Sequence, residues 1–339
     1  MEKINVAVTG VGGGVGQSII KCLASPKYRL IGLDADFEAT GLYGVARAYV
    51  IPFASDEHYI DALLKICKKE KCQFLFPGLD TELLKLSQHR SQFQVVGTTI
   101  IVSSPDVVRI ADNKFETYEF LKSHGFPAPA TIFLEDYLLR KKSLHFPLVI
   151  KPIRGGSRSV GVSIVPDKHT LQSLVSQKKI NNPQDFLLQE YIDGEEYTCG
   201  TVNADGECFG TIIMRRILRD GDTYKCFVVR NKKIEKLVIK LMQTLQPFGP
   251  CNVQLRLKQE TPYVFEINAR CSGTTAARAY AGFNEPKMMT DYLLTGVMPK
   301  FTIQNISILR YWKELIVQSR EISEMRLKKR IIQKKDRNL

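Results

Sequence analysis

The sequence predicts two successive folding units, an α/β unit with a parallel sheet and then an α+β unit. Over the first 112 residues, short apolar stretches alternate with amphipathic stretches of helical length. This alternation is typical of parallel strands joined by crossover helices. A cluster of one glycine and two prolines at 125–129 then interrupts the chain. Beyond it, apolar stretches follow one another across short turns, as antiparallel strands do.

The composition is that of a globular protein. The 339 residues suffice for two or three domains. Hydrophobic residues make up 44% and charged residues 24%, which is ordinary for a soluble chain. No apolar stretch is long enough to cross a membrane, and the N-terminus lacks the pattern of a secretory signal. We therefore expect a cytoplasmic protein without a membrane span, whose eight cysteines are reduced.

The first unit begins with a glycine-rich segment, residues 10–16, between a strand and a helix. A phosphate could bind helix N–H groups there, and Asp34 ends the second strand, which suggests a dinucleotide site. The glycine spacing departs from Gly-x-Gly-x-x-Gly, so tight packing of strand on helix is the other interpretation. We expect strands and helices in the order 4–9, 17–23, 28–33, 48–52, 57–69 and 74–76.

The second unit begins with a helix and continues as a series of strands. Its apolar stretches are separated by turns at 193–194, 204–207 and 260–262. Two further stretches have helical length and periodicity. We expect helices at 115–123, 170–177 and 232–245, and strands at 148–151, 160–165, 186–189, 196–203, 208–215, 251–257 and 263–267.

Three features of this unit suit the binding of a nucleotide. Lys151 ends a buried strand, where an ammonium group needs an anion or solvent. The hairpin 154–162 follows, and its two glycines remove side chains so that backbone N–H groups can close over phosphates. Further along, the apolar strand 187–192 could pair with an adenine edge, and Glu196 beyond the turn could accept ribose hydroxyls.

Polar residues alternate on the last two strands. Glu266, Asn268 and Arg270 follow one another at every second position and so point to one face. Together with Gln254 on the preceding strand, they offer the oxygen ligands that suit Mg²⁺. Arg270 beside them can neutralise charge on a transferred phosphoryl group.

In this order, these features resemble the ATP-grasp superfamily. The resemblance is closest to the ATP-binding halves of the carbamoyl phosphate synthetase large chain, in which Asn-Val-Gln precedes Glu-x-Asn-x-Arg. It implies a Rossmann-like pre-ATP-grasp domain at 1–112, followed by an ATP-grasp fold. The latter would have a small subdomain at 113–190 and a C-terminal subdomain with a metal site at 191–300. A C-terminal extension with a basic tail follows at 301–339.

The resemblance also assigns roles to residues that match its motifs. Arg270 and Lys151 are the expected catalytic residues, and Mg²⁺ or Mn²⁺ is expected at Gln254, Glu266 and Asn268. The expected ATP-binding residues are Lys114 and Lys151 (phosphates), Gly155, Gly156 and Ser157 (flexible phosphate loop), Glu190, Tyr191 and Ile192 (adenine), and Glu196 (ribose).

Other polar residues near these motifs are candidates for binding the second substrate. Asp80 follows a strand of the first unit, although it could equally cap a helix. Two arginines follow a strand of the second unit, and two hydroxyl residues come directly after Arg270. These substrate candidates are Asp80, Arg215, Arg216, Ser272 and Thr274.

The resemblance implies an ATP-dependent ligase with a single grasp. Such relatives join a carboxylate to an amine through an acyl phosphate, convert ATP to ADP and often form dimers, so a homodimer is expected. One alternative is an NAD(P)-dependent oxidoreductase that uses the glycine-rich segment. The other is a nucleic-acid-binding protein, because residues 320–339 carry eight basic against three acidic residues. A solvated, partly helical tail is the simpler interpretation of that charge.

Overall fold

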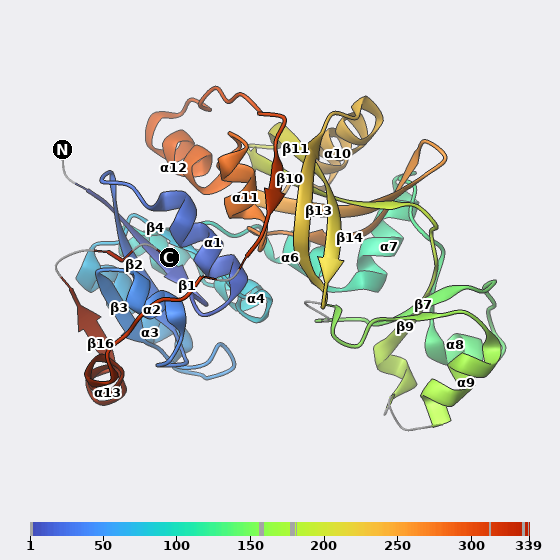
Figure 1. Cartoon of the computed structure of the whole chain (residues 1–339), viewed down its shortest axis with the longest axis horizontal. Coiled ribbons are helices and arrows are strands. Elements are labelled where there is room, and N and C mark those ends of the chain that lie inside the picture. The colour runs from blue at the N-terminus through green and yellow to red at the C-terminus, as the bar shows by residue number, and fades with distance from the viewer. Residues whose placement is uncertain are drawn as a thin grey trace.

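The computed structural model describes residues 3–155, 159–176, 180, 182–311, 313–333, 336–337 and 339. Within them the strands form three sheets. Figure 1 shows the N-terminal domain at one end of the molecule, the larger antiparallel sheet beside it, and the small sheet at the other end. No helix in the described part of the chain is both long and apolar enough to cross a membrane.

The N-terminal domain is the expected Rossmann-like unit. Its sheet has the order β16-β3-β2-β1-β4-β5, and the first five strands along the chain pair in parallel. These strands are β1 (Ile4–Thr9), β2 (Tyr28–Asp34), β3 (Arg47–Val50), β4 (Phe74–Phe76) and β5 (Thr99–Ile100). The helices are α1 (Gly14–Leu23), α2 (Thr40–Gly44), α3 (Tyr59–Glu70), α4 (Asp80–Gln88), α5 (Arg90–Val95) and α6 (Pro105–Asp112).

The glycine-rich segment serves packing in this domain. Helix α1 begins at Gly14, three residues before the predicted start, so the segment forms part of the helix. A Cβ on Gly16 would overlap the carbonyl oxygen of Gly10. The N–H of Gly12 donates to Asp34 Oδ2 at 2.7 Å. The loop thus lies directly against the sheet, as the packing interpretation predicts, and Asp34 already has a partner.

The small sheet has the order β6-β9-β7-β8. Its strands are β6 (Thr131–Phe133), β7 (Leu148–Pro152), β8 (Ser163–Val165) and β9 (Phe186–Glu190), with helices α7 (Lys114–Ser123), α8 (Leu134–Leu138) and α9 (Lys168–Ser176) and the 3₁₀ turn η2 (Pro183–Asp185). Strand β8 starts three residues later than predicted. Ser159 and Gly161 have positive φ angles, and the N–H of Val162 donates to Ser159 O, so residues 159–162 form a turn before the strand.

The larger sheet is antiparallel, with the order β14-β13-β10-β11-β12-β15. It consists of β10 (Glu195–Ala204), β11 (Glu207–Arg219), β12 (Asp222–Val229), β13 (Gly249–Lys258), β14 (Thr261–Asn268) and β15 (Ser307–Leu309). Helix α10 (Lys232–Leu245), found as predicted, buries Val238 and Leu241 in one core with Val253. Helices α11 (Thr275–Tyr280) and α12 (Glu285–Thr295) lie between this sheet and the N-terminal domain.

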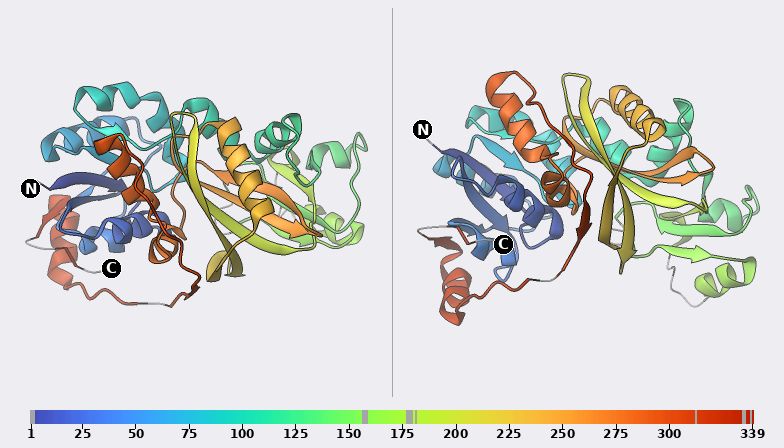
Figure 2. Two further views of the ribbon diagram at one scale, coloured as in Figure 1. Left: turned by 90° about the horizontal axis from the view of Figure 1, so that it is seen from above. Right: turned by 45° about the horizontal axis from the view of Figure 1, so that its top comes forward.

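The C-terminal extension connects the larger sheet to the N-terminal domain. After β15 it crosses to the N-terminal domain (Figure 2), where it forms α13 (Ser319–Lys328) and β16 (Arg330–Ile332). Strand β16 pairs antiparallel with β3, and the N–H of Arg337 donates to Gly44 O at 2.9 Å. The expectation of a solvated, partly helical tail is correct for α13 but wrong for 330–332, because these residues complete a sheet.

Candidate active site

A cleft of about 690 Å³ opens between the three sheets, a volume in the usual range for small-molecule sites. The N-terminal domain contributes its glycine-rich loop and the loop before α4. The small sheet contributes β7, β8 and β9, and the larger sheet contributes its polar face. Predicted residues in the cleft wall are Asp80, Lys114, Lys151, Gly155, Glu190, Tyr191, Ile192, Glu196, Arg216, Gln254, Glu266, Asn268, Arg270, Ser272 and Thr274.

Two lysines reach this cleft from the small-sheet side. Lys151 is only 4% exposed, and its Nζ donates to Gln189 Oε1 at 2.9 Å and to Phe265 O at 3.3 Å. Burial lowers the pKa of Lys151 to about 7, against the opposing effect of Glu266. Lys114, at the start of α7, donates from Nζ to Gly155 O at 2.5 Å. Both cations lack a carboxylate partner among the described residues, which suits them to an anionic ligand.

The predicted phosphate loop is described only in part. Gly155 has a φ of +69° and open space around the position of a Cβ. Gly156 and Ser157 lie outside the described residues. Gly155 is held to Lys114, so the one described member of the loop is next to a predicted phosphate-binding cation.

The predicted metal ligands lie side by side on β13 and β14. Gln254 is the cross-strand partner of Glu266, and Asn268 Nδ2 donates to Glu266 Oε1 at 3.0 Å. Gln254 Oε1 accepts a hydrogen bond from Arg216 Nη2 at 2.6 Å. Asn268 Oδ1 accepts only a long hydrogen bond of 3.4 Å from Arg270 Nη2. Glu266 and Asn268 are therefore better placed to offer oxygens to a cation than Gln254, whose oxygen is held closely by Arg216.

This donor set fits Mg²⁺ that is held mainly by its substrate. Within the described residues, no group of three or more His, Cys, Asp or Glu side chains is placed to hold a metal ion. Mg²⁺ commonly takes one or two carboxylates from the protein and its remaining ligands from phosphates and water. The Glu266–Asn268 pair satisfies that requirement.

Arg270 joins the larger sheet to the N-terminal domain. Its Nε and Nη2 donate to the two carboxylate oxygens of Asp80 at 2.6 and 2.7 Å. Burial disfavours its charge, but the Asp80 carboxylate outweighs this and raises the pKa of Arg270. The loop of Asp80 is fixed by buried Glu82, which accepts from the N–H groups of Gly78 and Leu79. Asp80, predicted to contact substrate, thus contacts a predicted catalytic residue.

The predicted ribose acceptor also has protein partners. Glu196 Oε1 accepts from Arg216 Nε at 2.8 Å, and its Oε2 accepts from Arg256 Nη2 at 3.0 Å. Arg256 also lies over the ring of Tyr191 and donates to Ile192 O. These contacts link the predicted ribose and adenine regions into one wall.

Arg215 does not reach the cleft with its neighbour Arg216. Adjacent residues of a strand point to opposite faces, and Arg215 stacks on Phe227 with its Nη1 3.4 Å from Glu195. Arg216 therefore lies in the cleft with the other predicted residues, whereas Arg215 does not.

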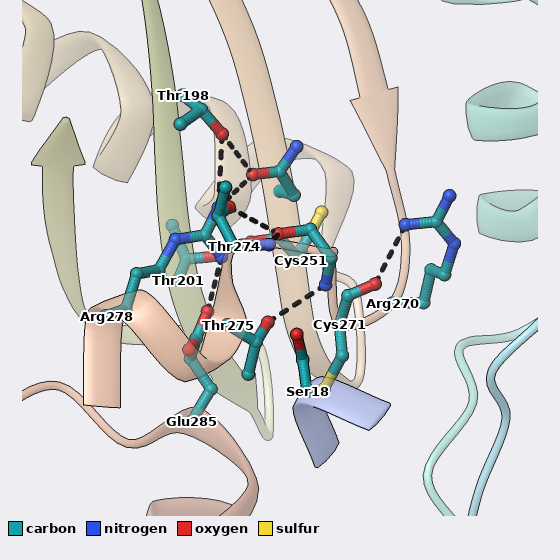
Figure 3. A network of polar contacts seen from close by, with 12 residues as sticks. Ser18, Thr198, Thr201, Cys251, Arg270, Cys271, Thr274, Thr275, Arg278 and Glu285 are labelled. Atoms are coloured by element: carbon teal, nitrogen blue, oxygen red, sulfur yellow. Dashed lines mark hydrogen bonds and ion pairs between the residues drawn. The ribbon is translucent and has the colours of Figure 1, made fainter. Parts of the chain in front are cut away.

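A buried network that was not predicted contacts Thr274, and Figure 3 shows it around Arg278. Its centre is Arg278, paired with Glu285 at 2.5 Å, and both side chains are fully buried. The sequence contains one signal for it, Gly200 in the middle of β10. A Cβ there would collide with both charged groups, and glycine within a strand often marks such a close approach.

Three family profiles match successive parts of the chain. A profile for the N-terminal domain of PylC-like proteins matches residues 7–101. The profile for the C-terminal part of D-Ala–D-Ala ligase matches residues 116–226. A profile described as ATP-grasp in the biosynthetic pathway with Ter operon matches residues 182–313.

Curated relatives match parts of the chain. The chain is 28% identical over 196 residues to the carbamoyl phosphate synthase large chain of Thermoanaerobacter sp., covering 52% of this chain and 18% of that protein. It is 26% identical over 198 residues to a D-alanine–D-alanine ligase of Polaromonas sp., covering 51% of this chain and 56% of that one. The chain thus spans about a fifth of the synthase chains it matches.

Solved structures share the fold. The L-amino acid ligase of Bacillus licheniformis superposes with a TM-score of 0.66 at 17% identity, covering 87% of this chain and 75% of that one. The N5-carboxyaminoimidazole synthetase of Staphylococcus aureus in complex with ADP gives 0.69 at 17% identity, covering 85% and 78%. The fold is that of the ATP-grasp enzymes. The profile matches and the curated relatives support an ATP-grasp enzyme, as the sequence motifs predict.

Proposed function

We propose that the chain is an ATP-dependent carboxylate–amine ligase. In this reaction a carboxylate oxygen attacks the γ-phosphorus of ATP, the bond to the β-phosphate oxygen breaks, and ADP leaves. The amine nitrogen then attacks the resulting acyl phosphate, so that an amide forms and inorganic phosphate leaves. The observation that carries this proposal is the convergence of Lys114, Lys151, Glu266, Asn268 and Arg270 on one cleft.

The comparisons support this reaction class. One curated relative is named a D-alanine–D-alanine ligase, and one structural neighbour an L-amino acid ligase. Another neighbour was solved with ADP, and a biotin carboxylase domain with MgADP. These proteins support ATP as the phosphoryl donor and a carboxylate and an amine as the substrates.

The cleft residues would divide the work by position. Lys151 and Lys114 would bind phosphates, because both are buried cations without a carboxylate partner among the described residues. The segment Glu190–Ile192 would contact adenine at the junction of the small and larger sheets. Glu266 and Asn268 would hold Mg²⁺, which neutralises phosphate charge when bound.

Arg270 would stabilise the phosphoryl group during its transfer. Its charge is permanent, and Asp80 fixes the plane of the guanidinium with two hydrogen bonds. A preorganised cation of this kind needs no reorganisation while charge develops. Positioning and charge neutralisation, rather than covalent catalysis, are therefore what the side chains supply.

Replacement of Glu266 tests the proposal. In Glu266→Gln the shape stays and the only carboxylate of the proposed metal site is lost. We expect ADP release, measured across a panel of carboxylates and amines, to fall on the order of 100-fold or more. The matched control is Glu260→Gln in the exposed turn before β14, where Glu260 pairs only with Lys233 at 3.2 Å.

The first measurement is thermal melting with Mg²⁺ and a non-hydrolysable ATP analogue. A ligand at 100 times its Kd adds about 2.7 kcal/mol to the free energy of unfolding. We expect this stabilisation in the unmodified protein and in Glu260→Gln, and its loss in Glu266→Gln. Full turnover of Glu266→Gln, or stabilisation by NAD⁺ or NADPH alone, would contradict the proposal.

A further inference from the structure

Polar side chains at one end of the cleft are almost completely buried. Asn252 is 1% exposed, Ser272 7% and Thr274 5%, and all three line the cleft. Asn252 lies on β13 as the cross-strand partner of Asn268. Ser272 and Thr274 lie in the segment between β14 and α11. A buried polar group costs free energy unless it has a partner, so the partners of these side chains define what this end of the cleft can bind.

Arg278 contacts two of these side chains, Asn252 and Thr274, and Figure 3 shows it next to Thr274, Thr198 and Glu285. Its Nη2 donates to Thr274 Oγ1 at 3.0 Å, to Thr198 Oγ1 at 3.1 Å and to Asn252 Oδ1. Glu285 balances its charge from the opposite side. An arginine side chain has hydrogen-bond donors and no acceptor. Every group that faces Arg278 must therefore present an oxygen to it.

This constraint fixes the orientation of the Asn252 amide. Asn252 Oδ1 accepts from Arg278 and also from the hydroxyl of Thr198 at 2.6 Å. The amide oxygen is thus turned away from the cleft. Nδ2 makes no hydrogen bond to any residue that the structure describes, and its two hydrogens are available to a ligand.

The same constraint passes through Thr274 to Ser272. Because Thr274 Oγ1 accepts from Arg278, its own hydrogen is free to donate to Ser272 Oγ, 2.8 Å away. Ser272 Oγ also accepts from the N–H of Thr274 at 3.2 Å. With Thr274 as the donor of this hydroxyl pair, Ser272 Oγ accepts twice, and its own hydrogen is left for an acceptor in the cleft. It is a second donor at the surface of the cleft.

We propose that Arg278 is a positioning residue that turns the Asn252 amide and the Ser272 hydroxyl into paired donors, which form a subsite for an oxyanion. This inference rests on the proposed function: the oxyanion is either the carboxylate of a substrate or the phosphate that the reaction releases. Glu285 neutralises the charge of Arg278. The subsite therefore selects its ligand by the oriented hydrogen-bond donors of Asn252 and Ser272 and not by a net positive charge. Gly200 leaves room for the pair against β10.

Two substitutions in the cleft wall test the subsite. Asn252→Asp keeps the shape and replaces the donor by an oxygen that repels an anion, and Ser272→Ala removes the second donor. Inorganic phosphate and acetate are titrated separately into protein loaded with Mg²⁺–ADP. Hydrogen bonds to charged groups are strong, so we expect each substitution to weaken oxyanion binding about 10-fold or more while ADP affinity changes less than threefold.

Ser18→Ala is the matched control. Ser18 Oγ donates to Gly273 O at 3.1 Å and so anchors the same segment, but it offers no donor at the subsite. We expect oxyanion affinity to change less than threefold. Arg278→Lys keeps a cation beside Glu285 but reduces its donors, and we expect it to weaken oxyanion binding as Ser272→Ala does. If this variant does not fold, Asn252→Asp and Ser272→Ala still decide.

The two probes distinguish the source of the oxyanion. Weakened binding of acetate supports a subsite for the substrate carboxylate, and weakened binding of phosphate alone supports a subsite for the released phosphate. Unchanged affinity for both probes in Asn252→Asp and Ser272→Ala would overturn the inference. Unmodified protein that does not bind Mg²⁺–ADP would instead overturn the proposed function, and titration of the nucleotide-free variants would then decide the subsite.

Discussion

Two glycine-rich loops of this chain look alike in sequence and differ in their surroundings. In the loop at residues 10–16, Gly16 packs against Gly10 and the N–H of Gly12 is occupied by Asp34, while Gly13 and Gly14 face the cleft. In the hairpin that follows β7, Gly155 has open space on its Cβ side and contacts the predicted phosphate-binding Lys114. Glycine content alone therefore does not identify a phosphate site. What matters is whether the N–H groups and the space beside the loop remain free.

The largest effect that separates the two regions is expected from Lys151→Met. Methionine matches the length of the buried stem but has no charge for a phosphate. ADP release should fall on the order of 100-fold, while the free energy of unfolding stays equal or increases, since burial of an ammonium group is costly. Turnover and denaturant titration measure the two quantities.

Lys233→Met is the control for that substitution. Lys233 lies on the surface at the start of α10 and pairs only with exposed Glu260. It should leave turnover unchanged. Equal activity of Lys151→Met and the unmodified protein would show that the phosphates bind elsewhere, and would return attention to the N-terminal loop.

A smaller effect is expected from Gly16→Ala. Its methyl group would overlap Gly10 O, and overpacking of this kind costs about 1–3 kcal/mol. Gly14→Ala is the matched control, because its Cβ position is open and alanine favours a helix. Denaturant titration should show a loss of stability only for Gly16→Ala. Unchanged stability of Gly16→Ala, or an equal loss in Gly14→Ala, would contradict the packing role.

The smallest effect is a pH dependence that only the small-sheet side should show. Burial lowers the pKa of Lys151 from 10.5 to about 7. Between these values the unfolded chain keeps the proton that the folded chain has lost, so the free energy of unfolding rises with pH. Nucleotide affinity has the opposite sign, because phosphate prefers the protonated amine.

We therefore expect the Kd for ADP to increase as pH rises above 7, by at most about tenfold per pH unit. Calorimetric titration between pH 6 and 8.5 measures it. Lys151→Met should bind weakly at every pH without this slope. An unchanged slope in that variant would assign the titration to another group.

Much of the fold could be predicted because its signals are local. Strand β1 and helix α10 were predicted at their observed bounds, since hydrophobic periodicity within one element depends only on neighbours in the sequence. Strand β12 was missed because it mixes Asp222, Lys225 and apolar residues on a partly solvated strand. Strand β16 was missed because its charged context indicates a tail, whereas pairing with the distant β3 decides its structure.

In the site as well, local patterns were predictable and contacts between distant segments were not. Alternation on one strand was enough to place Glu266, Asn268 and Arg270 on one face, and the structure has all three in the cleft. Arg215 and Arg216 were predicted together, although alternation separates them. The Arg278 network brings β10, β13 and α12 together, and no spacing within one segment encodes such a meeting.

The pairing of β16 with β3 has a consequence for the order of events during synthesis. Until residues 330–332 have left the ribosome, β3 is an edge strand with unpaired backbone groups. Such an edge can pair with other chains, and N-terminal domains usually fold first as translation proceeds. The N-terminal domain is therefore completed by a strand from far along the chain, and newly made chains must protect that edge until residues 330–332 have been translated.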